Sequence, residues 1–367
     1  MIDEKLDVGK TTVVVALSGG VDSSVVALLL KKQGYNVVGL HMKTANEESS
    51  VADEQSVYDL CKKLNIDCKV VEYTSQMQQV KDYFVQEYLS GRTPNPCVVC
   101  NKEVKFAPFI EFANQIGADY FATGHYANIE HIDDKHILKT AVDQQKDQSY
   151  FLCSLSQDQL KKALFPLGRL TKQDVRKIAE DAGFVSANKK DSYDVCFLGS
   201  QKFKDFMNQN YPEKAGDMID VKTGKVVGKH SGISKYTLGQ RKGLGIGGGY
   251  GETGEGWFVA KKDITNNILY VAQGLADELY SNALVSKKFN WIPCKPNQSK
   301  FECFAKFRYR QAYQKVSVLQ NEDGSVLVDF AEPQRAITTG QYVVLYQQNG
   351  DGYNCLGGGT IDEVIKN

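Results

Sequence analysis

The stretch TTVVVALSGGVDSSVVALLLKKQG, residues 11–34 of a 367-residue chain, decides the fold. Residues 12–17 form a short, apolar, β-branched run, which is typical of a buried parallel strand. The apolar spacing over residues 25–32 predicts a helix that Gly34 ends. Between them lies SGGVDSS, residues 18–24. A turn rich in glycine and serine between a strand and a helix presents backbone N–H groups that can bind phosphate.

The same alternation continues through the first half of the chain. Further strands are expected at residues 37–42, 68–73 and 120–123, and helices at 53–64, from about 102 to 116, and from a capping box at 171–174 to residue 182. Residues 127–140 alternate and turn at Asp133-Asp134, which predicts a β-hairpin. Strands that alternate with helices indicate a doubly wound parallel α/β sheet.

The second half of the chain has a different character. Glycines cluster over residues 239–256, and helical periodicity fades after Gly199. Short alternating runs then occur at residues 301–309, 315–319, 325–330 and 341–346, which is typical of a small antiparallel barrel. We therefore expect three domains: a catalytic α/β domain at 1–205, a small central domain with a glycine-rich loop at 206–283, and an antiparallel β-barrel at 284–367.

Composition narrows the class of protein. The 44 basic residues balance the 44 acidic ones, so an RNA partner would need local basic patches. Residues 1–10 lack the apolar core of a signal peptide, and no run approaches the roughly 20 apolar residues of a membrane span, so we expect a cytoplasmic protein without membrane contact. In a reducing cytosol, the nine cysteines would be buried thiols, metal ligands or nucleophiles rather than disulfides.

The loop at residues 18–24 resembles that of the ATP pyrophosphatase family. Ser18, Ser23 and Ser24 offer hydroxyl donors, whereas the Asp22 carboxylate near a phosphate would help to hold Mg²⁺. The resemblance implies that ATP releases pyrophosphate and transfers AMP to a carbonyl oxygen of the substrate. It also implies that ATP contacts Ala16, Leu17, Ser18, Gly19, Gly20, Val21, Asp22, Ser23, Met42 and Gly124.

Three cysteines stand apart from the other six. Cys97 and Cys100 form a CxxC pair in residues 91–101, which two prolines and a glycine predict to be a loop, and Cys196 follows Tyr193-Asp194-Val195. A CxxC pair in a loop indicates a metal, a cluster or redox chemistry. The remaining cysteines fall in helical or strand patterns and are expected to be core or surface residues; they are Cys61, Cys68, Cys153, Cys294, Cys303 and Cys355.

The neighbourhood of these cysteines resembles the bacterial tRNA-specific 2-thiouridylase family. The matching motifs are TPNPxxxCNKEVKF at residues 93–106, ATGHY at 122–126, KDQSYFL at 146–152, TLGQRKGL at 237–244 and KFRYR at 306–310. The resemblance implies ATP-dependent 2-thiolation of the wobble uridine U34 in the tRNAs for lysine, glutamate and glutamine. It also implies a sulfur-donor or sulfur-relay protein as a partner.

Residue roles follow from this resemblance position by position. Cys100 matches the first catalytic cysteine and Cys196 the cysteine that carries a persulfide, while Asn95, Pro96 and residue 97 match the loop that meets the target base. The commoner family residue at position 97 is Asp, and this chain has Cys97. Two routes therefore stay open: a persulfide and disulfide route through Cys100 and Cys196, or a [4Fe–4S] cluster held by Cys97, Cys100 and Cys196.

The expected RNA contacts lie mostly in the second half of the chain. On a strand, alternation would put Lys306, Arg308 and Arg310 on one face as a phosphate stripe, with Tyr309 on the other. The tRNA-binding residues expected in all are His125, Lys146, Asp147, Gln148, Arg241, Lys306, Arg308, Tyr309 and Gln341. Two rival functions remain, an ATP pyrophosphatase of the amidotransferase type and a noncatalytic tRNA-binding protein with a degenerate site.

Overall fold

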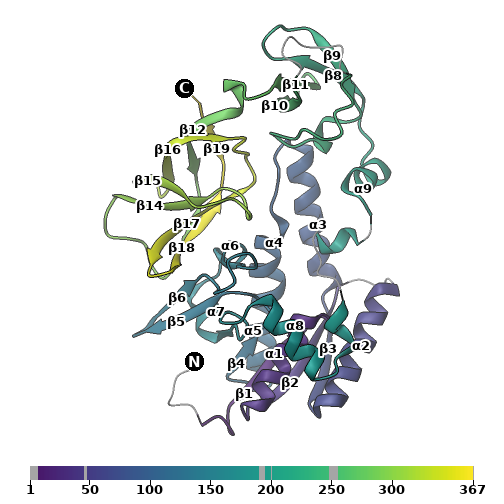
Figure 1. The fold of residues 1–367 in the computed structure, drawn as a ribbon, viewed down its shortest axis with the longest axis vertical. Coiled ribbons are helices and arrows are strands. Elements are labelled where there is room, and N and C mark those ends of the chain that lie inside the picture. The colour runs from purple at the N-terminus through teal and green to yellow at the C-terminus, as the bar shows by residue number, and fades with distance from the viewer. Residues whose placement is uncertain (1–6, 45–47, 190–194, 200, 248–254, 367) are drawn as a thin grey trace.

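A computed structural model describes residues 7–44, 48–189, 195–199, 201–247 and 255–366. The N-terminal part is built on a five-stranded parallel sheet in the order β3-β2-β1-β4-β7 (Figure 1). Its strands are β1 (Thr12–Leu17), β2 (Asn36–Lys43), β3 (Asp67–Glu72), β4 (Tyr120–Ala122) and β7 (Ala163–Leu164). The predicted strands at the start of the chain are thereby confirmed.

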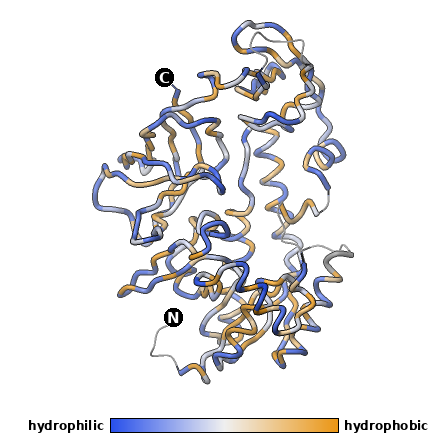
Figure 2. The backbone as a smooth tube through the Cα atoms, viewed as in Figure 1, coloured by the Kyte–Doolittle hydropathy of each residue, from blue (hydrophilic) through white to orange (hydrophobic). Residues whose placement is uncertain are grey.

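Helices cover both faces of this sheet, because β1 is apolar on both sides. Val13 and Val15 pack into one core with helix α1 (Val21–Lys32), whereas Val14 packs into a second core on the other face. The other helices of this part are α2 (Glu48–Leu64), α3 (Thr74–Leu89), α5 (Ala107–Gln115), α7 (Gln157–Lys162) and α8 (Lys172–Asp181). Figure 2 shows how densely hydrophobic residues run through this region. The predicted doubly wound α/β sheet is confirmed.

Helix α1 begins at Val21, four residues before the predicted start. Gly19 has φ +70°, a left-handed conformation that lets the chain turn sharply out of β1. The Ser24 hydroxyl donates to the Gly20 carbonyl at 2.9 Å and supports the first helical turn. Asp22, Ser23 and Ser24 therefore belong to the helix, and the loop itself is only Ser18-Gly19-Gly20.

The segment 91–101 was predicted to be a loop, and that prediction was wrong for its second half. Helix α4 (Pro96–Val99) runs directly into a π-helical segment, Cys100–Phe106, and on into α5. Pro96 takes the first helical position, where its fixed φ favours a helix and its missing N–H costs nothing. Cys97 and Cys100 consequently lie on a helix, one turn apart.

Two β structures follow. A four-stranded sheet in the order β10-β11-β8-β9 forms the central region after helix α9 (Phe203–Asn210); its strands are β8 (Gly216–Asp220), β9 (Val226–His230), β10 (Trp257–Asp263) and β11 (Ile268–Gln273).

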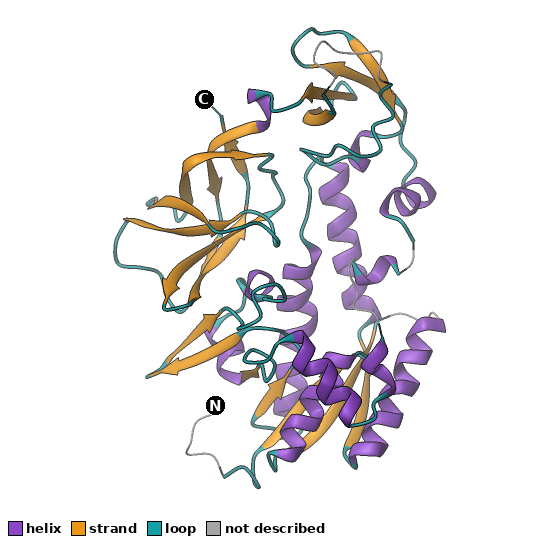
Figure 3. Ribbon diagram, in the orientation of Figure 1, coloured by secondary structure: helices purple, strands orange, loops and turns teal. Residues whose placement is uncertain are grey.

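The C-terminal antiparallel sheet then confirms the predicted barrel strands; its elements are β12 (Tyr280–Ser286), β13 (Phe289–Trp291), β14 (Lys300–Lys306), β15 (Gln314–Gln320), β16 (Val326–Arg335), β17 (Tyr342–Asn349), β18 (Gly352–Thr360) and β19 (Glu363–Ile365). Figure 3 shows helices gathered around the parallel sheet and strands in the other two regions.

The predicted hairpin is present and joins two regions that lie far apart in the sequence. Strands β5 (Asn128–Ile132) and β6 (Lys135–Lys139) turn at Asp133, which has φ +51°. Lys139 of β6 pairs with Asn354 of β18. The hairpin therefore extends the C-terminal sheet and fixes the barrel against the N-terminal domain, as the lower left of Figure 1 shows.

Candidate active site

The first part of the site is the loop between β1 and α1, at the carboxyl edge of the parallel sheet. Serine side chains brace it from within: the Ser18 N–H donates to the Ser23 hydroxyl at 3.2 Å, and the Ser23 hydroxyl contacts the Gly20 carbonyl. Gly124, which follows β4, packs against the first turn of α1, and a Cβ there would lie 3.0 Å from the Asp22 side chain and 3.1 Å from the Ser23 nitrogen. A side chain at position 124 would crowd this helix start, which favours glycine there.

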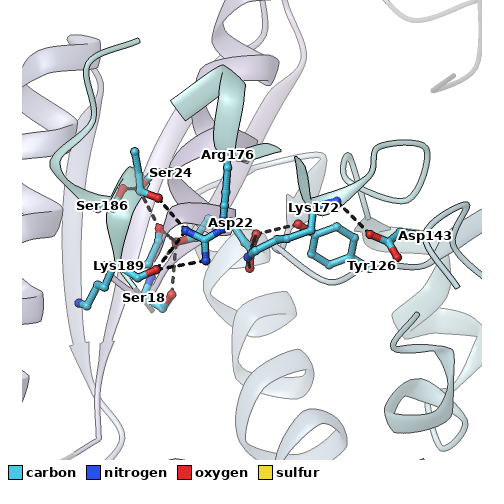
Figure 4. A network of polar contacts seen from close by, with 12 residues as sticks. Ser18, Asp22, Ser24, Tyr126, Asp143, Lys172, Arg176, Ser186 and Lys189 are labelled. Atoms are coloured by element: carbon cyan, nitrogen blue, oxygen red, sulfur yellow. Dashed lines mark hydrogen bonds and ion pairs between the residues drawn. The ribbon is translucent and has the colours of Figure 1, made fainter. Parts of the chain in front are cut away.

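Asp22 is the centre of a polar network (Figure 4). The Lys172 ammonium group lies 2.7 Å from each of its two carboxylate oxygens, and the Tyr126 hydroxyl donates to one of them at 2.8 Å. The backbone N–H of Lys172 donates to Asp143 at 2.9 Å. On the other side of the loop, Lys189 contacts the Gly19 carbonyl at 3.4 Å. Cations from distant segments thus converge on the loop.

Sequence reasoning missed Lys172 and Lys189. Residues 171–174 were recognised as a capping box, which the structure confirms, but Lys172 was not singled out within it. One signal was available: a lysine at the first position of a helix faces the positive end of the helix dipole, so its placement there needs an explanation. Tyr126 did appear, as the last residue of the ATGHY motif.

The second part of the site holds the thiols. Cys100 is buried in a small cluster with Met77, Val80 and Val104, against which Phe197 and Met42 also pack. The Phe197 ring meets Phe84 of α3 edge-on at 5.2 Å. Because Phe197 adjoins Cys196 in a 3-10 turn (Cys196–Leu198), this packing brings the Cys196 segment to the Cys100 helix. Tyr193 and Asp194 of the same motif lie outside the described residues.

The positive charge of Lys105 interacts with all three thiols, Cys97, Cys100 and Cys196. Although burial acts to lower its pKa, the neighbouring Cys100, Cys196 and Cys97 raise the Lys105 pKa above its ordinary value. Burial in turn raises the pKa of Cys97 to about 11 and that of Cys100 above its usual range, and Lys105 only partly opposes this. At Cys97 and Cys100, desolvation therefore outweighs the single cation, and the pKa of each thiol stays above its ordinary value.

His125 lies close enough to Lys105 for the lysine charge to act on its pKa. Burial, assisted by the Lys105 charge, lowers the His125 pKa to about 3. One ring nitrogen shares a hydrogen bond with the Thr123 hydroxyl at 2.8 Å, and the ring packs beside Phe106 and Phe165. A neutral imidazole in this place can exchange hydrogen bonds with a base but cannot pair with a phosphate as a cation.

The expected metals do not fit these residues as they lie. Among the described residues, no three His, Cys, Asp or Glu side chains come together in a set that could hold a metal ion, and Cys97, Cys100 and Cys196 are all described. At the loop, both Asp22 oxygens already accept hydrogen bonds from Lys172. A [4Fe–4S] cluster and an Asp22-bound Mg²⁺ would both require side chains to move.

The loop expected to meet the target base is held by the barrel. The Gln341 side-chain amide donates to the carbonyls of Thr93 at 2.9 Å and Pro94 at 3.1 Å, and the Thr93 N–H donates to the Thr339 carbonyl at 2.9 Å. Gly340 has φ +88°, and a Cβ there would lie 2.9 Å from the Thr93 backbone. The C-terminal barrel therefore positions the segment that leads directly into Cys97 and Cys100.

Comparisons with known proteins agree along the whole chain. Residues 11–200 match the tRNA methyl transferase HUP domain, 204–273 the tRNA methyl transferase PRC-barrel domain, and 281–361 the aminomethyltransferase beta-barrel domain. The tRNA-specific 2-thiouridylase MnmA of Halalkalibacterium halodurans is 50% identical over 365 residues, which cover 97% of this chain and 96% of that protein. This chain belongs to the tRNA-specific 2-thiouridylase family.

Another relative matches the chain over a similar length. The tRNA-specific 2-thiouridylase MnmA of Alkaliphilus oremlandii is 50% identical over 364 residues, covering 97% of this chain and 98% of that protein. Among solved structures, the U34-tRNA thiolase NcsA of Methanococcus maripaludis covers 56% of this chain and 69% of its own, with 19% identity and a TM-score of 0.35. That structural likeness is too small to bear on the chemistry of the thiouridylase site.

The phosphate stripe predicted for this thiouridylase rested on a strand that is shorter than expected. β14 ends at Lys306, and the chain then turns, with the Phe307 N–H donating to the Gln311 side chain at 2.9 Å. The prediction that Lys306, Arg308 and Arg310 share one strand face was therefore wrong, because alternation stops where the strand stops.

The side chains of that segment have separate surroundings. Lys306 is buried with its ammonium group 4.1 Å from the centre of the Tyr313 ring, whereas the Arg308 guanidinium donates to the carbonyls of Leu238 at 3.1 Å and Ala336 at 2.8 Å. Arg308 thereby ties the central region to the barrel. The Tyr309 ring lies 4.3 Å from that of Phe151, beside the catalytic domain.

Of the remaining residues expected to bind tRNA, Lys146 donates its backbone N–H to the Asp143 carbonyl at 3.0 Å. The other three form two groups. Asp147 and Gln148 act within the fold: buried Asp147 accepts from the Ala141 N–H at 2.9 Å, and the Gln148 side chain accepts from the Tyr126 N–H at 2.9 Å. Arg241 is exposed and lines a hollow of about 320 Å³ with the glycine-rich segment, part of which, residues 248–254, is outside the described residues. None of the described helices is long and apolar enough to cross a membrane.

Proposed function

We propose that this chain uses ATP to replace the C2 oxygen of uridine in tRNA with sulfur, and that its target is the wobble uridine U34. The observation that carries this proposal is the full-length identity of 50% to tRNA-specific 2-thiouridylases, combined with the presence of both the ATP loop and the two thiols that the reaction needs. Met42, which the family resemblance makes an ATP contact, is partly buried at the end of β2 and packs against the cluster that contains Cys100.

The first half-reaction activates the base. The C2 oxygen attacks the α-phosphorus of ATP as the uridine N3 proton is released, and the bond to pyrophosphate breaks, so that pyrophosphate leaves with the electron pair. The loop at Ser18-Gly19-Gly20 and the start of α1 would bind the departing phosphates, because free backbone N–H groups and the helix dipole favour anions there. The oxygen thereby becomes part of AMP, which is a good leaving group.

The second half-reaction delivers sulfur. The terminal sulfur of a persulfide on Cys196 attacks C2, and AMP leaves with the electrons of the C–O bond. The Cys100 thiolate then attacks the Cys196 sulfur, which breaks the S–S bond and leaves sulfur on C2 as a thiocarbonyl. The product disulfide between Cys100 and Cys196 needs a dithiol or thiol reductant to restore both thiols. Lys105 is the cation that favours the attacking thiolate.

The proposed reaction needs two partners, a tRNA and a sulfur-donor protein. The uridine must come from tRNA, and the family resemblance favours the lysine, glutamate and glutamine isoacceptors. The persulfide on Cys196 must be supplied by a sulfur-donor protein, and Cys196 is exposed, as such a transfer between proteins requires. The barrel, the hairpin and Arg241 are the surfaces that we propose meet the RNA.

Thiolation of unmodified tRNA tests the function directly. The protein is incubated with ATP, a persulfide donor and unmodified tRNA, and nucleosides are analysed by mass spectrometry together with pyrophosphate release. We expect one pyrophosphate and one 2-thiouridine for each turnover. An amidotransferase would yield no thiolated nucleoside, and ADP with phosphate in step with thiolation would refute adenylation.

Iron analysis tests the alternative sulfur route. The persulfide route uses Cys100 and Cys196 alone, whereas a cluster would also need Cys97. We expect anaerobically purified protein to thiolate tRNA without bound iron, and Cys97→Ser to keep most of the activity. Stoichiometric iron that disappears, together with activity, in Cys97→Ser would reinstate the cluster.

A further inference from the structure

We infer that His41 is a further nucleotide-binding residue, and that its ring nitrogen Nε2 accepts a hydrogen bond from the adenosine part of ATP. This inference deepens the proposed function and rests on ATP being its cosubstrate. His41 belongs neither to the phosphate loop nor to the thiol site. It lies on β2, the strand next to the one that leads into the loop (Figure 1).

His41 is a buried histidine near the carboxyl end of β2. Its Cα is in register with that of Leu17, the last residue of β1, and Ser18 of the loop follows directly. The side chain is 5% exposed, and its Nδ1 lies 2.9 Å from the Leu17 carbonyl oxygen. A polar ring is thus built into the edge of the sheet beside the loop that we propose binds the phosphates.

The hydrogen bond to Leu17 decides what the other ring nitrogen can do. A carbonyl oxygen only accepts, so Nδ1 carries the hydrogen, and in an uncharged imidazole Nε2 then presents a lone pair. Nε2 is buried and has no hydrogen-bond partner among the described residues. Buried polar atoms are nearly always paired, because an unpaired acceptor has lost its hydrogen bonds to water without replacement. Nε2 is therefore an acceptor that a ligand can satisfy.

The packing of β2 limits the direction from which a donor can reach this ring. Side chains two residues apart on a strand share a face, so His41 lies on the same face as Gly39. That face is filled at Gly39, since a Cβ there would lie 2.7 Å from Leu17 Cδ1 and 2.8 Å from Cys61 Sγ. The middle of the sheet is therefore closed, and a donor for Nε2 has to come from the carboxyl edge.

The carboxyl edge is where a nucleotide is expected to lie. In open α/β sheets, ligands bind outside the carboxyl ends of the strands. Helix α2 lies against the loop here, since the Asp53 carbonyl oxygen is 3.1 Å from the position of a Cβ on Gly19. Neighbouring strands are about 4.8 Å apart, so the sugar and base of a nucleotide whose phosphates occupy the loop can reach the end of β2. Adenosine offers two kinds of donor there, the ribose hydroxyls and the adenine amino group.

ATP binding in the absence of tRNA tests this assignment separately from thiolation. Affinity is measured by calorimetry for ATP and for three analogues that each lack one donor: 2′-deoxy-ATP, 3′-deoxy-ATP and purine riboside triphosphate. Two substitutions divide the functions of the ring. His41→Asn keeps a donor near the position of Nδ1 and removes the Nε2 acceptor, whereas His41→Gln places an amide oxygen near the position of Nε2.

His230→Asn is the matched control. His230 is a buried histidine of the central sheet, and both of its ring nitrogens have partners, the Asn267 carbonyl and the Gly232 N–H. Thermal melting of every variant verifies folding. If His41→Asn does not fold, His41→Phe replaces it in the same measurements.

We expect His41→Asn to weaken ATP binding about 10-fold, because an acceptor that pairs with the nucleotide is lost. His41→Gln should recover most of the affinity, and His230→Asn should match the wild type. One of the three analogues should bind the wild type about 10-fold more weakly than ATP, and the group that it lacks is the donor to Nε2. In His41→Asn, that analogue should bind as tightly as ATP.

Two results would overturn the inference. One is wild-type ATP affinity in a folded His41→Asn or His41→Phe variant, which would leave Nε2 to a buried water molecule. The other is an equal loss of affinity for ATP and for all three analogues, which would make His41 a support of the loop. A wild type that binds ATP as expected but does not thiolate would contradict the proposed function and leave this inference standing. A wild type that does not bind ATP would contradict both.

Discussion

Charged groups are balanced differently at the ATP loop and at the thiol site. At the loop, Asp22 is matched by Lys172 and Tyr126, so charge is balanced before any ligand arrives. At the thiols, Lys105 is set against desolvation, which holds the pKa of Cys97 and Cys100 above the ordinary value of a thiol. The charged groups at the loop are thus paired with one another, whereas the one cation at the thiols does not outweigh desolvation.

The two sites also differ in how they are assembled. The core of the ATP site, the loop with the first turn of α1, comes from one continuous stretch, Ser18 to Ser24. The thiol site needs Cys100, the Cys196 segment held through Phe197, and Thr93 and Pro94, which Gln341 of the barrel holds. A disturbance of the barrel should consequently reach the thiols and leave ATP binding unchanged. The predictions below test this separation.

Removing either of the two thiols that we propose to be catalytic should give the largest effect. Cys100→Ser and Cys196→Ser should each reduce thiolation by at least about 10³-fold, because each thiol forms a covalent bond in the proposed cycle. ATP-analogue affinity should remain within twofold of wild type. Mass spectrometry of nucleosides measures thiolation, and a titration measures ATP binding. A parallel loss of ATP binding would contradict the idea that the two sites act separately.

Disturbing the barrel turn at Gly340 should have the second largest effect on thiolation. Gly340→Ala strains a residue at φ +88° and places a Cβ 2.9 Å from the Thr93 backbone, so it should cost about 1–3 kcal/mol and lower thiolation strongly. Gly324→Ala is the matched control, since Gly324 has φ +82° and no atom within 4 Å of the added Cβ. Urea unfolding and tRNA binding separate the outcomes. Equal thiolation in both variants would show that the turn does not position the base loop.

The Lys105 charge should control the pH profile. A cation lowers the pKa of a neighbouring thiol, so Lys105→Met should raise the Cys100 pKa and move the rising limb of activity to higher pH. Each unit of that shift lowers the thiolate fraction about tenfold below the pKa. Alkylation rates of Cys100 with iodoacetamide from pH 7 to 10, in a Cys97→Ser background, measure it. An unmoved profile would mean that Lys105 acts elsewhere.

The smallest expected effects are those of substitutions at Arg308 and Arg310, which should differ in kind. Arg308→Gln removes hydrogen bonds to Leu238 and Ala336 and should reduce the free energy of unfolding by about 1 kcal/mol. Arg310→Gln should reduce the salt slope of tRNA binding by about one. Chemical unfolding and filter binding at several salt concentrations check both. If Arg308→Gln alone alters the slope, its guanidinium contacts phosphate as well as the barrel.

The sequence by itself determined the nucleotide half of this protein. A β-branched run, two glycines, an acidic residue and a helical pattern within 22 residues predict a strand, a phosphate loop and a helix, because each of these depends on neighbours in the chain. The alternating runs after Leu284 likewise predicted the barrel strands. Short motifs identified the family, and comparison with relatives confirmed it.

Only the tertiary structure decided how these parts cooperate. Pro96 turned an expected loop into a helix, β14 ended before the basic stripe could form, and Lys172 reached Asp22 from 150 residues away. It also decided that the barrel holds Thr93 and Pro94 and that desolvation raises the pKa of Cys97 and Cys100. Local pattern cannot reveal such features, because burial, charge pairing and strand ends depend on which distant segments pack together.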